Sequence, residues 1–298
     1  MKKQHFFFFI ILLLFAVIGA ALGLQGKNAY DTTSADDTLV QDSLSEILYK
    51  NSRVKHPLML GERLIFKIRY GFIRAGTATM SVLEENETDG NSVLHIQTTA
   101  KSASGFNWIY KVEDVVSTYV RIPDFYPVHF EKKLREGSYF ADQYMDFFPD
   151  DSLAVVENVR FDDEMQIKHR EKKEIKTPPF IKDVLSAFYI IRTMDLTVGN
   201  PVYITTIEKY KVYELKVIVH KIETLTVEAG KFRCLVIEPV LKEEGIFKNK
   251  GRLKIWLTDD ELKIPVQMKT EVVVGSITTE LIKIEGHHKK IAAQLDGR

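Results

Sequence analysis

The stretch Leu64-Ile-Phe-Lys-Ile-Arg-Tyr70 places an apolar side chain at every second position on one face, while Lys67 and Arg69 point to the other face. A repeat of two residues is typical of a half-buried antiparallel β-strand. Further strand-like runs follow along the chain, separated by turn residues such as Asp89-Gly90, Pro123 and Gly137. Strand signals at this spacing predict a sandwich or barrel-like sheet and argue against alternating strands and helices.

Working outward, the same pattern predicts twelve strands in two groups. They cover residues 64–70, 77–83, 93–100, 115–122, 128–134 and 139–147, and then 202–207, 211–227, 232–238, 253–257, 264–274 and 277–284. The charge run from Lys168 to Lys176 fits a solvated strand or loop, with an anionic partner as the alternative.

One segment between the two groups has helical spacing. Its apolar residues at 184, 185, 188, 191 and 194 follow Pro178-Pro179 and stop before Gly199. They predict a helix over 180–195 that is apolar on most of its circumference and therefore buried against a sheet. The predicted fold is mainly β: curved antiparallel sheets, sandwich or open-barrel-like, with one buried central helix and a short N-terminal amphipathic helix.

The N-terminus predicts export. Lys2 and Lys3 precede an apolar run from Phe6 to Leu24, as in a secretory signal peptide. Cleavage after Gly23 would remove residues 1–23, although the run of 19 residues is also long enough to remain as a membrane anchor. Both alternatives place the chain in the periplasm or cell envelope of a Gram-negative bacterium, with anchorage in the inner membrane in the second.

The remaining chain divides into three predicted parts. Residues 24–57 form a linker and a short amphipathic helix over 36–49. Residues 58–286 form a β-rich domain, which the central helix divides into two parts of similar character, with internal duplication left open. Residues 287–298 form a basic tail that we expect to be loose.

Composition excludes several classes of protein. The 298 residues are 45% hydrophobic and 28% charged, as in an ordinary globular protein. The 41 basic and 41 acidic residues balance, and loss of Lys2 and Lys3 leaves 39 basic residues, so no basic surface for nucleic acid is expected. A single cysteine, Cys234, excludes an intramolecular disulfide and a multi-cysteine zinc site.

No catalytic motif is recognised. The sequence has no nucleophile elbow, no zinc-protease helix, no phosphate loop and no dinucleotide-binding fingerprint. His95, His129 and His220 lie in predicted strands, where a packed or solvated role is expected, and Cys234 is expected to be a small buried residue. Acidic pairs such as Asp259-Asp260 lie at predicted turns. We therefore expect no catalytic residue, no metal and no cofactor.

Aromatic residues offer the best candidates for a binding site. Aromatic side chains fill cores and also line apolar ligand pockets. A curved sheet with a helix across it could enclose such a pocket, and the candidate ligand-binding residues are Phe106, Trp108, Tyr110, Phe188, Tyr189 and Trp256.

Several motifs together resemble a family of exported bacterial proteins, the DUF3108 domain. They include Gly61–Gly71, Ala75–Ala78, the segment Asp183–Arg192, Ala229–Phe232 and Gly251–Asp260. The resemblance covers about residues 58–285 and implies an envelope-located β-rich protein. It implies no catalytic residues, because none are established for the family.

Three functions remain open. The first is a non-catalytic envelope protein that binds a lipid, an acyl chain or an envelope partner, with membrane contact only through an uncleaved N-terminal segment. The second is an envelope hydrolase whose site is assembled from dispersed residues such as His129, Asp142 and Asp146. The third is a structural scaffold.

Overall fold

A computed structural model describes residues 58–88, 91–108, 110–122, 124–241, 252–271, 275–287 and 290–295. The predicted signal segment and the predicted helix over 36–49 lie outside these residues. Within the described ranges, no helix is long and apolar enough to span a membrane.

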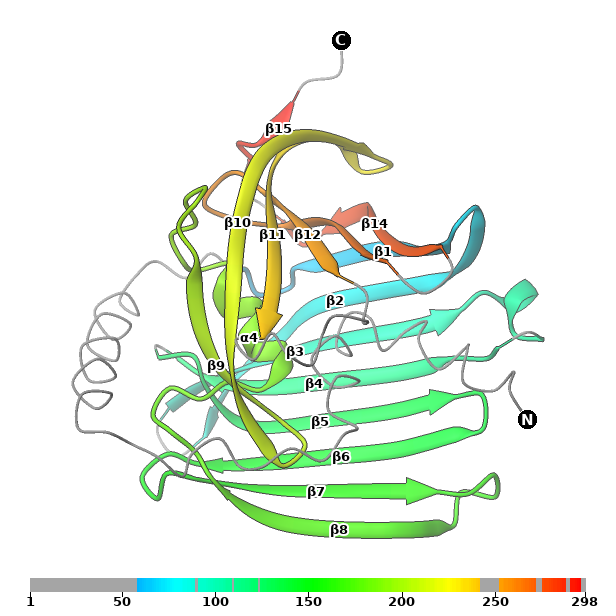
Figure 1. Cartoon of the computed structure of the whole chain (residues 1–298), viewed down its shortest axis with the longest axis vertical. Coiled ribbons are helices and arrows are strands. Elements are labelled where there is room, and N and C mark those ends of the chain that lie inside the picture. The colour runs from blue at the N-terminus through cyan, green and yellow to red at the C-terminus, as the bar shows by residue number, and fades with distance from the viewer. Residues whose placement is uncertain are drawn as a thin grey trace.

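The described chain forms one large antiparallel sheet (Figure 1). The strand order is β8-β7-β6-β5-β4-β3-β2-β1-β14-β13-β12-β11-β10-β9, and β15 pairs with β11. The first eight strands are β1 (Arg63–Tyr70), β2 (Ile73–Thr88), β3 (Asn91–Ser102), β4 (Glu113–Arg121), β5 (Tyr126–Glu136), β6 (Tyr139–Phe148), β7 (Leu153–Phe161) and β8 (Ile167–Lys176). The others are β9 (Val202–Glu208), β10 (Lys211–Val227), β11 (Gly230–Leu241), β12 (Leu253–Thr258), β13 (Pro265–Glu271), β14 (Ser276–Glu285) and β15 (Gln294–Leu295).

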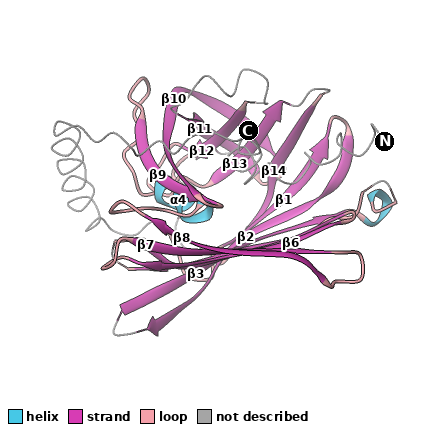
Figure 2. Ribbon diagram, turned by 60° about the horizontal axis from the view of Figure 1, so that its bottom comes forward, coloured by secondary structure: helices cyan, strands magenta, loops and turns pink. Residues whose placement is uncertain are grey.

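The mainly β prediction is confirmed, but the sheet is continuous rather than two packed sheets. The junction is β1, which pairs with β2 on one side and with β14 on the other, so that Tyr70 lies opposite both Ile73 and Ile277. The two halves of the sheet diverge from this junction and enclose the helix α4 (Val184–Ile191) (Figure 2). Neighbouring strands rotate relative to one another, and this twist accumulates into strong curvature over so many strands.

The buried helix is also confirmed, and it is shorter than predicted. Helix α4 spans Val184–Ile191, because Asp183 caps its N-terminus by accepting hydrogen bonds from the backbone N–H groups of Leu185 and Ser186. Upstream, Phe180 has a φ of 61°, which is incompatible with a helical start. The Thr118 hydroxyl of β4 donates a 2.6 Å hydrogen bond to the same Asp183 carboxylate. The cap therefore also attaches α4 to the inner face of the sheet.

Apolar residues from both halves form the main core around α4. A second, smaller core lies on the opposite face of β11, because successive residues of a strand point to opposite sides. Cys234 is in this second core, buried with Phe232, Val236 and Trp256 as expected of a small apolar side chain. Residues 290–295 are not loose as predicted, since β15 pairs with β11 and Ala293 is buried.

The two edge strands of the sheet approach each other without forming a ladder in the described chain. Instead, the hydroxyl of Tyr210, in the β9–β10 turn, donates a 3.1 Å hydrogen bond to the carbonyl oxygen of Glu171 in β8. The Lys173 ammonium lies 4.4 Å from the centroid of the Tyr210 ring. The sheet is therefore an open barrel. Its seam is held by these side chains and by backbone hydrogen bonds between β9 and Lys182, which lies in the segment after β8. The lysine-rich sequence of β8 suits an exposed edge, because charges there discourage pairing with other chains.

Close backbone approach explains the glycine of the Ala75-Gly76 motif. A Cβ atom on Gly76 would lie 2.3 Å from the carbonyl oxygen of Lys101 on β3. The φ of Gly76 is not in the left-handed region, so backbone strain does not require glycine here. Glycine is required because the backbones of β2 and β3 are crowded at this point, beside the register shift in the β1–β2 pairing between Ile68 and Arg69.

Candidate functional site

Polar side chains gather on the inner face of β4, β5 and β6, where the core would otherwise continue. Asp114, Lys132 and Glu136 alternate with outward-facing residues and share the inner face with the core residue Phe130. Across the interior, Glu208 at the end of β9 reaches the same region. All four polar residues are buried, which is costly for charged groups unless they are paired.

Asp114 and Glu136 form a carboxyl pair. Burial, followed by the charge of Asp114, raises the pKa of Glu136 to about 9. Burial also raises the pKa of Asp114 to about 6, although its Oδ1 accepts a 2.8 Å hydrogen bond from the backbone N–H of Arg135. Two adjacent buried carboxyls cannot both ionise easily. At neutral pH the pair therefore holds one proton and one negative charge.

A buried ion pair joins β5 to β9. The Nζ atom of Lys132 lies 2.7 Å from Oε1 of Glu208. Across the ladder from Lys132 is Gln143, whose amide donates a 2.9 Å hydrogen bond to Asn158 on β7. Tyr139 lies within electrostatic range of both Glu136 and Glu208, so the carboxyl pair and the ion pair belong to one polar cluster.

Two acceptor oxygens in this cluster have no hydrogen-bond partner among the protein groups. They are Oε1 of Gln143 and Oε2 of Glu208, and both residues are almost completely buried. Glu136, by contrast, is engaged with Asp114 in the carboxyl pair. Buried acceptors in native proteins are normally paired with protein, water or ligand. The cluster can therefore accept hydrogen bonds from a hydroxyl or ammonium group that enters the interior. In the described part of the chain, no group of His, Cys, Asp and Glu is arranged to hold a metal ion.

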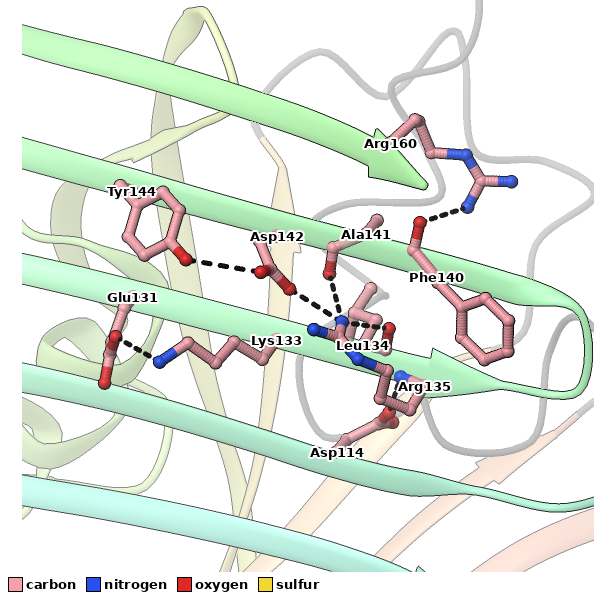
Figure 3. A network of polar contacts seen from close by, with 10 residues as sticks. All are labelled: Asp114, Glu131, Lys133, Leu134, Arg135, Phe140, Ala141, Asp142, Tyr144 and Arg160. Atoms are coloured by element: carbon pink, nitrogen blue, oxygen red, sulfur yellow. Dashed lines mark hydrogen bonds and ion pairs between the residues drawn. The ribbon is translucent and has the colours of Figure 1, made fainter. Parts of the chain in front are cut away.

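The outer face of the same strands carries a further polar network, which Figure 3 shows together with its link to Asp114 through the backbone N–H of Arg135. Asp142 is held by Arg135 at 2.7 Å and by the hydroxyl of Tyr144 at 3.2 Å, and Lys133 pairs with Glu131 at 2.8 Å. These contacts connect neighbouring strands on the solvent side. Asp142, a candidate for the hydrolase hypothesis, is thus engaged by its own neighbours and lies on the face opposite the carboxyl pair.

The two other hydrolase candidates do meet. Nδ1 of His129 lies 2.7 Å from a carboxylate oxygen of Asp146, directly opposite on β6. Tyr119 lies beside His129 and stacks on His95 with ring centroids 4.2 Å apart, as part of a row of side chains across four strands. The row is on the outer face and partly exposed to solvent. General acid–base catalysis needs a positioned substrate in addition to a His–Asp contact.

The six aromatic candidates do not form one group. Phe188 and Tyr189 touch edge to face on α4, with Tyr189 fully buried. Phe106, Trp108 and Tyr110 lie in the β3–β4 connection, where Phe106 is buried in the core and Trp108 is exposed. Trp256 is in the second core, on the face opposite α4, and its indole N–H donates to Glu223.

The polar cluster was missed because its members are dispersed in sequence. Lys132 was the only member with a local sequence signal: the predicted strand over 128–134 places this charged residue on the same face as the apolar Phe130. The approach of Glu208 depends on the curvature of the whole sheet, which no local pattern reports.

Comparison with known proteins gives a family and two similar folds. The family described as "Protein of unknown function (DUF3108)" matches residues 65–282. No curated protein matches the chain. A beta-barrel-like protein of the DUF1849 domain of unknown function from Brucella abortus is 11% identical, with a TM-score of 0.47, covering 76% of this chain and 97% of that chain. A protein with a YmcC-like fold from Bacteroides fragilis, assigned as exported, is 10% identical, with a TM-score of 0.35, covering 77% of this chain and 97% of that chain. We draw no inference from either structural likeness.

Proposed function

This chain belongs to the DUF3108 family, for which no function is established, and from its own residues we propose that it is an exported, non-catalytic envelope protein that binds a lipid. The acyl chain lies between the two halves of the sheet, and the polar group of the lipid meets the buried polar cluster. Export is supported by Lys2, Lys3 and the apolar run from Phe6 to Leu24.

The observation on which this proposal depends is the set of unpaired, buried acceptors beside an apolar interior. Oε1 of Gln143 and Oε2 of Glu208 lack protein donors, while Phe130 and Met145 on the same inner face belong to the main core. A lipid with a hydroxyl or ammonium group offers both an apolar chain and hydrogen-bond donors. Burial of the chain would supply most of the affinity, at about 25 cal/mol per Å² before the cost of association.

The open seam supports access to this interior. The edge strands β8 and β9 meet through Tyr210, Glu171 and Lys173, without a backbone ladder between the two strands in the described residues. The only backbone pairing recorded beside this seam is the short one between β9 and Lys182, in the segment after β8. Side-chain contacts can separate at lower cost than a strand ladder, because each is worth about 1 kcal/mol. Helix α4, which spans only Val184–Ile191, is then the element that an incoming chain contacts.

Brominated acyl chains would test the binding position through quenching of tryptophan fluorescence. The variant with Phe188→Trp and Trp108→Phe has one indole on α4 and keeps Trp256 on the opposite face. We expect a brominated fatty alcohol, which carries the hydroxyl donor that the cluster requires, to quench the indole at position 188 and to leave Trp256 unquenched, because only the first adjoins the proposed chain.

The matched control has Trp108→Phe alone, so that Trp256 is its only indole. Circular dichroism would establish that both variants are folded. Equal, weak quenching in the two folded variants would contradict acyl-chain binding between the halves of the sheet.

A further inference from the structure

Two large aromatic side chains project from one end of the sheet. Phe72 is 103% exposed at the β1–β2 turn, where Gly71 adopts a φ of 56° and Ile73 is also exposed. Trp108 is 83% exposed in the connection between β3 and β4. Neither side chain contributes to the core, and exposed apolar side chains mark a contact surface where several of them gather on one face.

The register places these two tips at the same end of the sheet. Gly76 pairs with Ser102, so the β1–β2 turn and the β3–β4 connection both extend beyond this point (Figure 1). The Trp108 turn is anchored, because Phe106 is buried and the Ser102 hydroxyl donates a 2.6 Å hydrogen bond to Asn107. We name the surface formed by Phe72, Ile73 and Trp108 the aromatic tips.

Basic side chains surround the aromatic tips. Arg74, Lys101 and Lys111 are exposed beside them. Among the described residues, the acids nearest the tips are two. Glu113 lies 3.3 Å from Lys101 and 3.8 Å from Lys111, and the exposed Glu271 pairs with Ser276 beside the β1–β2 turn. The local balance is therefore positive. The acidic β7–β8 turn at residues 162–164 lies at the far edge of the sheet, outside this surface.

We propose that the aromatic tips dock this protein on a membrane surface with anionic lipid head groups. Tryptophan and phenylalanine insert readily at the boundary between head groups and acyl chains. Each nearby lysine or arginine adds about 1 kcal/mol of attraction to anionic lipid. The tips belong to separate turns that project beyond the strands, which suits a fluid interface, whereas protein partners usually bind aromatic residues at the centre of a packed patch.

This docking goes beyond lipid binding in the interior and does not depend on it. The docking also orients the interior relative to the membrane. Two members of the polar cluster lie close to the aromatic tips along the strands, because Asp114 follows Lys111 by three residues and Glu136 pairs with Val112. The polar cluster therefore lies just inside the end of the sheet that faces the membrane.

Fluorescence of Trp108 on lipid vesicles tests the docking. The exported protein, purified from the envelope with Trp256→Phe, retains Trp108 as its sole indole. Vesicles of phosphatidylethanolamine and brominated phosphatidylglycerol should quench this indole and shift its emission to the blue. Adding Phe72→Ser should raise the lipid concentration for half-maximal quenching by about tenfold, which corresponds to about 1.4 kcal/mol of binding free energy lost with the buried aromatic side chain.

The matched control is Phe148→Ser. Phe148 is 43% exposed at the opposite end of the sheet, and its loss should leave the quenching curve unchanged. Absence of quenching on the anionic vesicles would overturn the proposal, as would equal effects of Phe72→Ser and Phe148→Ser. The proposal would also be overturned in favour of a protein partner if a soluble envelope protein shielded Trp108 from a water-soluble quencher while brominated vesicles left its fluorescence unquenched.

Discussion

Replacing Arg192 with methionine is expected to lower the free energy of unfolding by about 3–5 kcal/mol. Arg192 and Glu62 are both fully buried, and two N–H groups of the guanidinium donate to the two carboxylate oxygens at 2.7 Å and 2.9 Å. A third guanidinium N–H donates to the carbonyl oxygen of Leu262. The pair attaches the end of α4 to the start of β1, and methionine would leave the Glu62 carboxylate without this partner in the interior.

Urea denaturation of wild type and variant measures this effect. The adjacent pair Arg63–Glu285 is a matched control, because it is exposed and Arg63→Met should cost no more than about 1 kcal/mol. The double variant Glu62→Gln, Arg192→Met should recover part of the loss, since it removes the unpaired charge. Equal costs for Arg192→Met and Arg63→Met would contradict a structural role for the buried pair.

The second large effect is on the pH dependence of stability. Between about pH 5 and pH 8, Glu136 should lower the free energy of unfolding of the wild type by about 2–4 kcal/mol. In Glu136→Gln this pH-dependent loss should be absent. The folded-state pKa of Glu136 is raised from 4.5 to about 9, so the folded chain keeps a proton that the unfolded chain releases. Stability therefore falls as pH rises across this interval. Glutamine keeps the shape and has no proton to release.

Denaturation midpoints at the two pH values would measure the difference. Glu113→Gln is the control, because Glu113 is exposed on the outer face of β4 next to Asp114. Its pH dependence should match the wild type. The same pH dependence of stability in wild type, Glu113→Gln and Glu136→Gln would contradict a carboxyl pair that shares a proton.

Much of the β structure could be predicted from local patterns. The alternation in Leu64–Tyr70 and in the segment over 211–227 corresponds closely to β1 and β10, because one face of each strand segment is apolar. β7 falls on a stretch with no predicted strand, since both its faces carry apolar residues, such as Val155 and Val156, and no strict alternation is visible. The strand character of β8 could only be left open, because an edge strand exposed on both faces lacks an apolar pattern.

Long-range features could not be predicted. The continuous sheet depends on β1 pairing with β14, which is about 200 residues away along the chain. The polar cluster depends on Glu208 reaching Lys132 across the interior. Similarly, Phe106 and Trp108 are two residues apart in one connection, but one is buried and the other is exposed. Composition alone cannot distinguish these two aromatic residues.

The most direct test of lipid binding is native mass spectrometry of the protein purified from the bacterial envelope without delipidation. We expect a second species, heavier by the mass of one lipid, that loses this mass on collisional activation. Repeated observation of the unliganded mass alone, together with no binding of fluorescent acyl probes, would contradict the proposal that the interior between the two halves of the sheet holds a lipid.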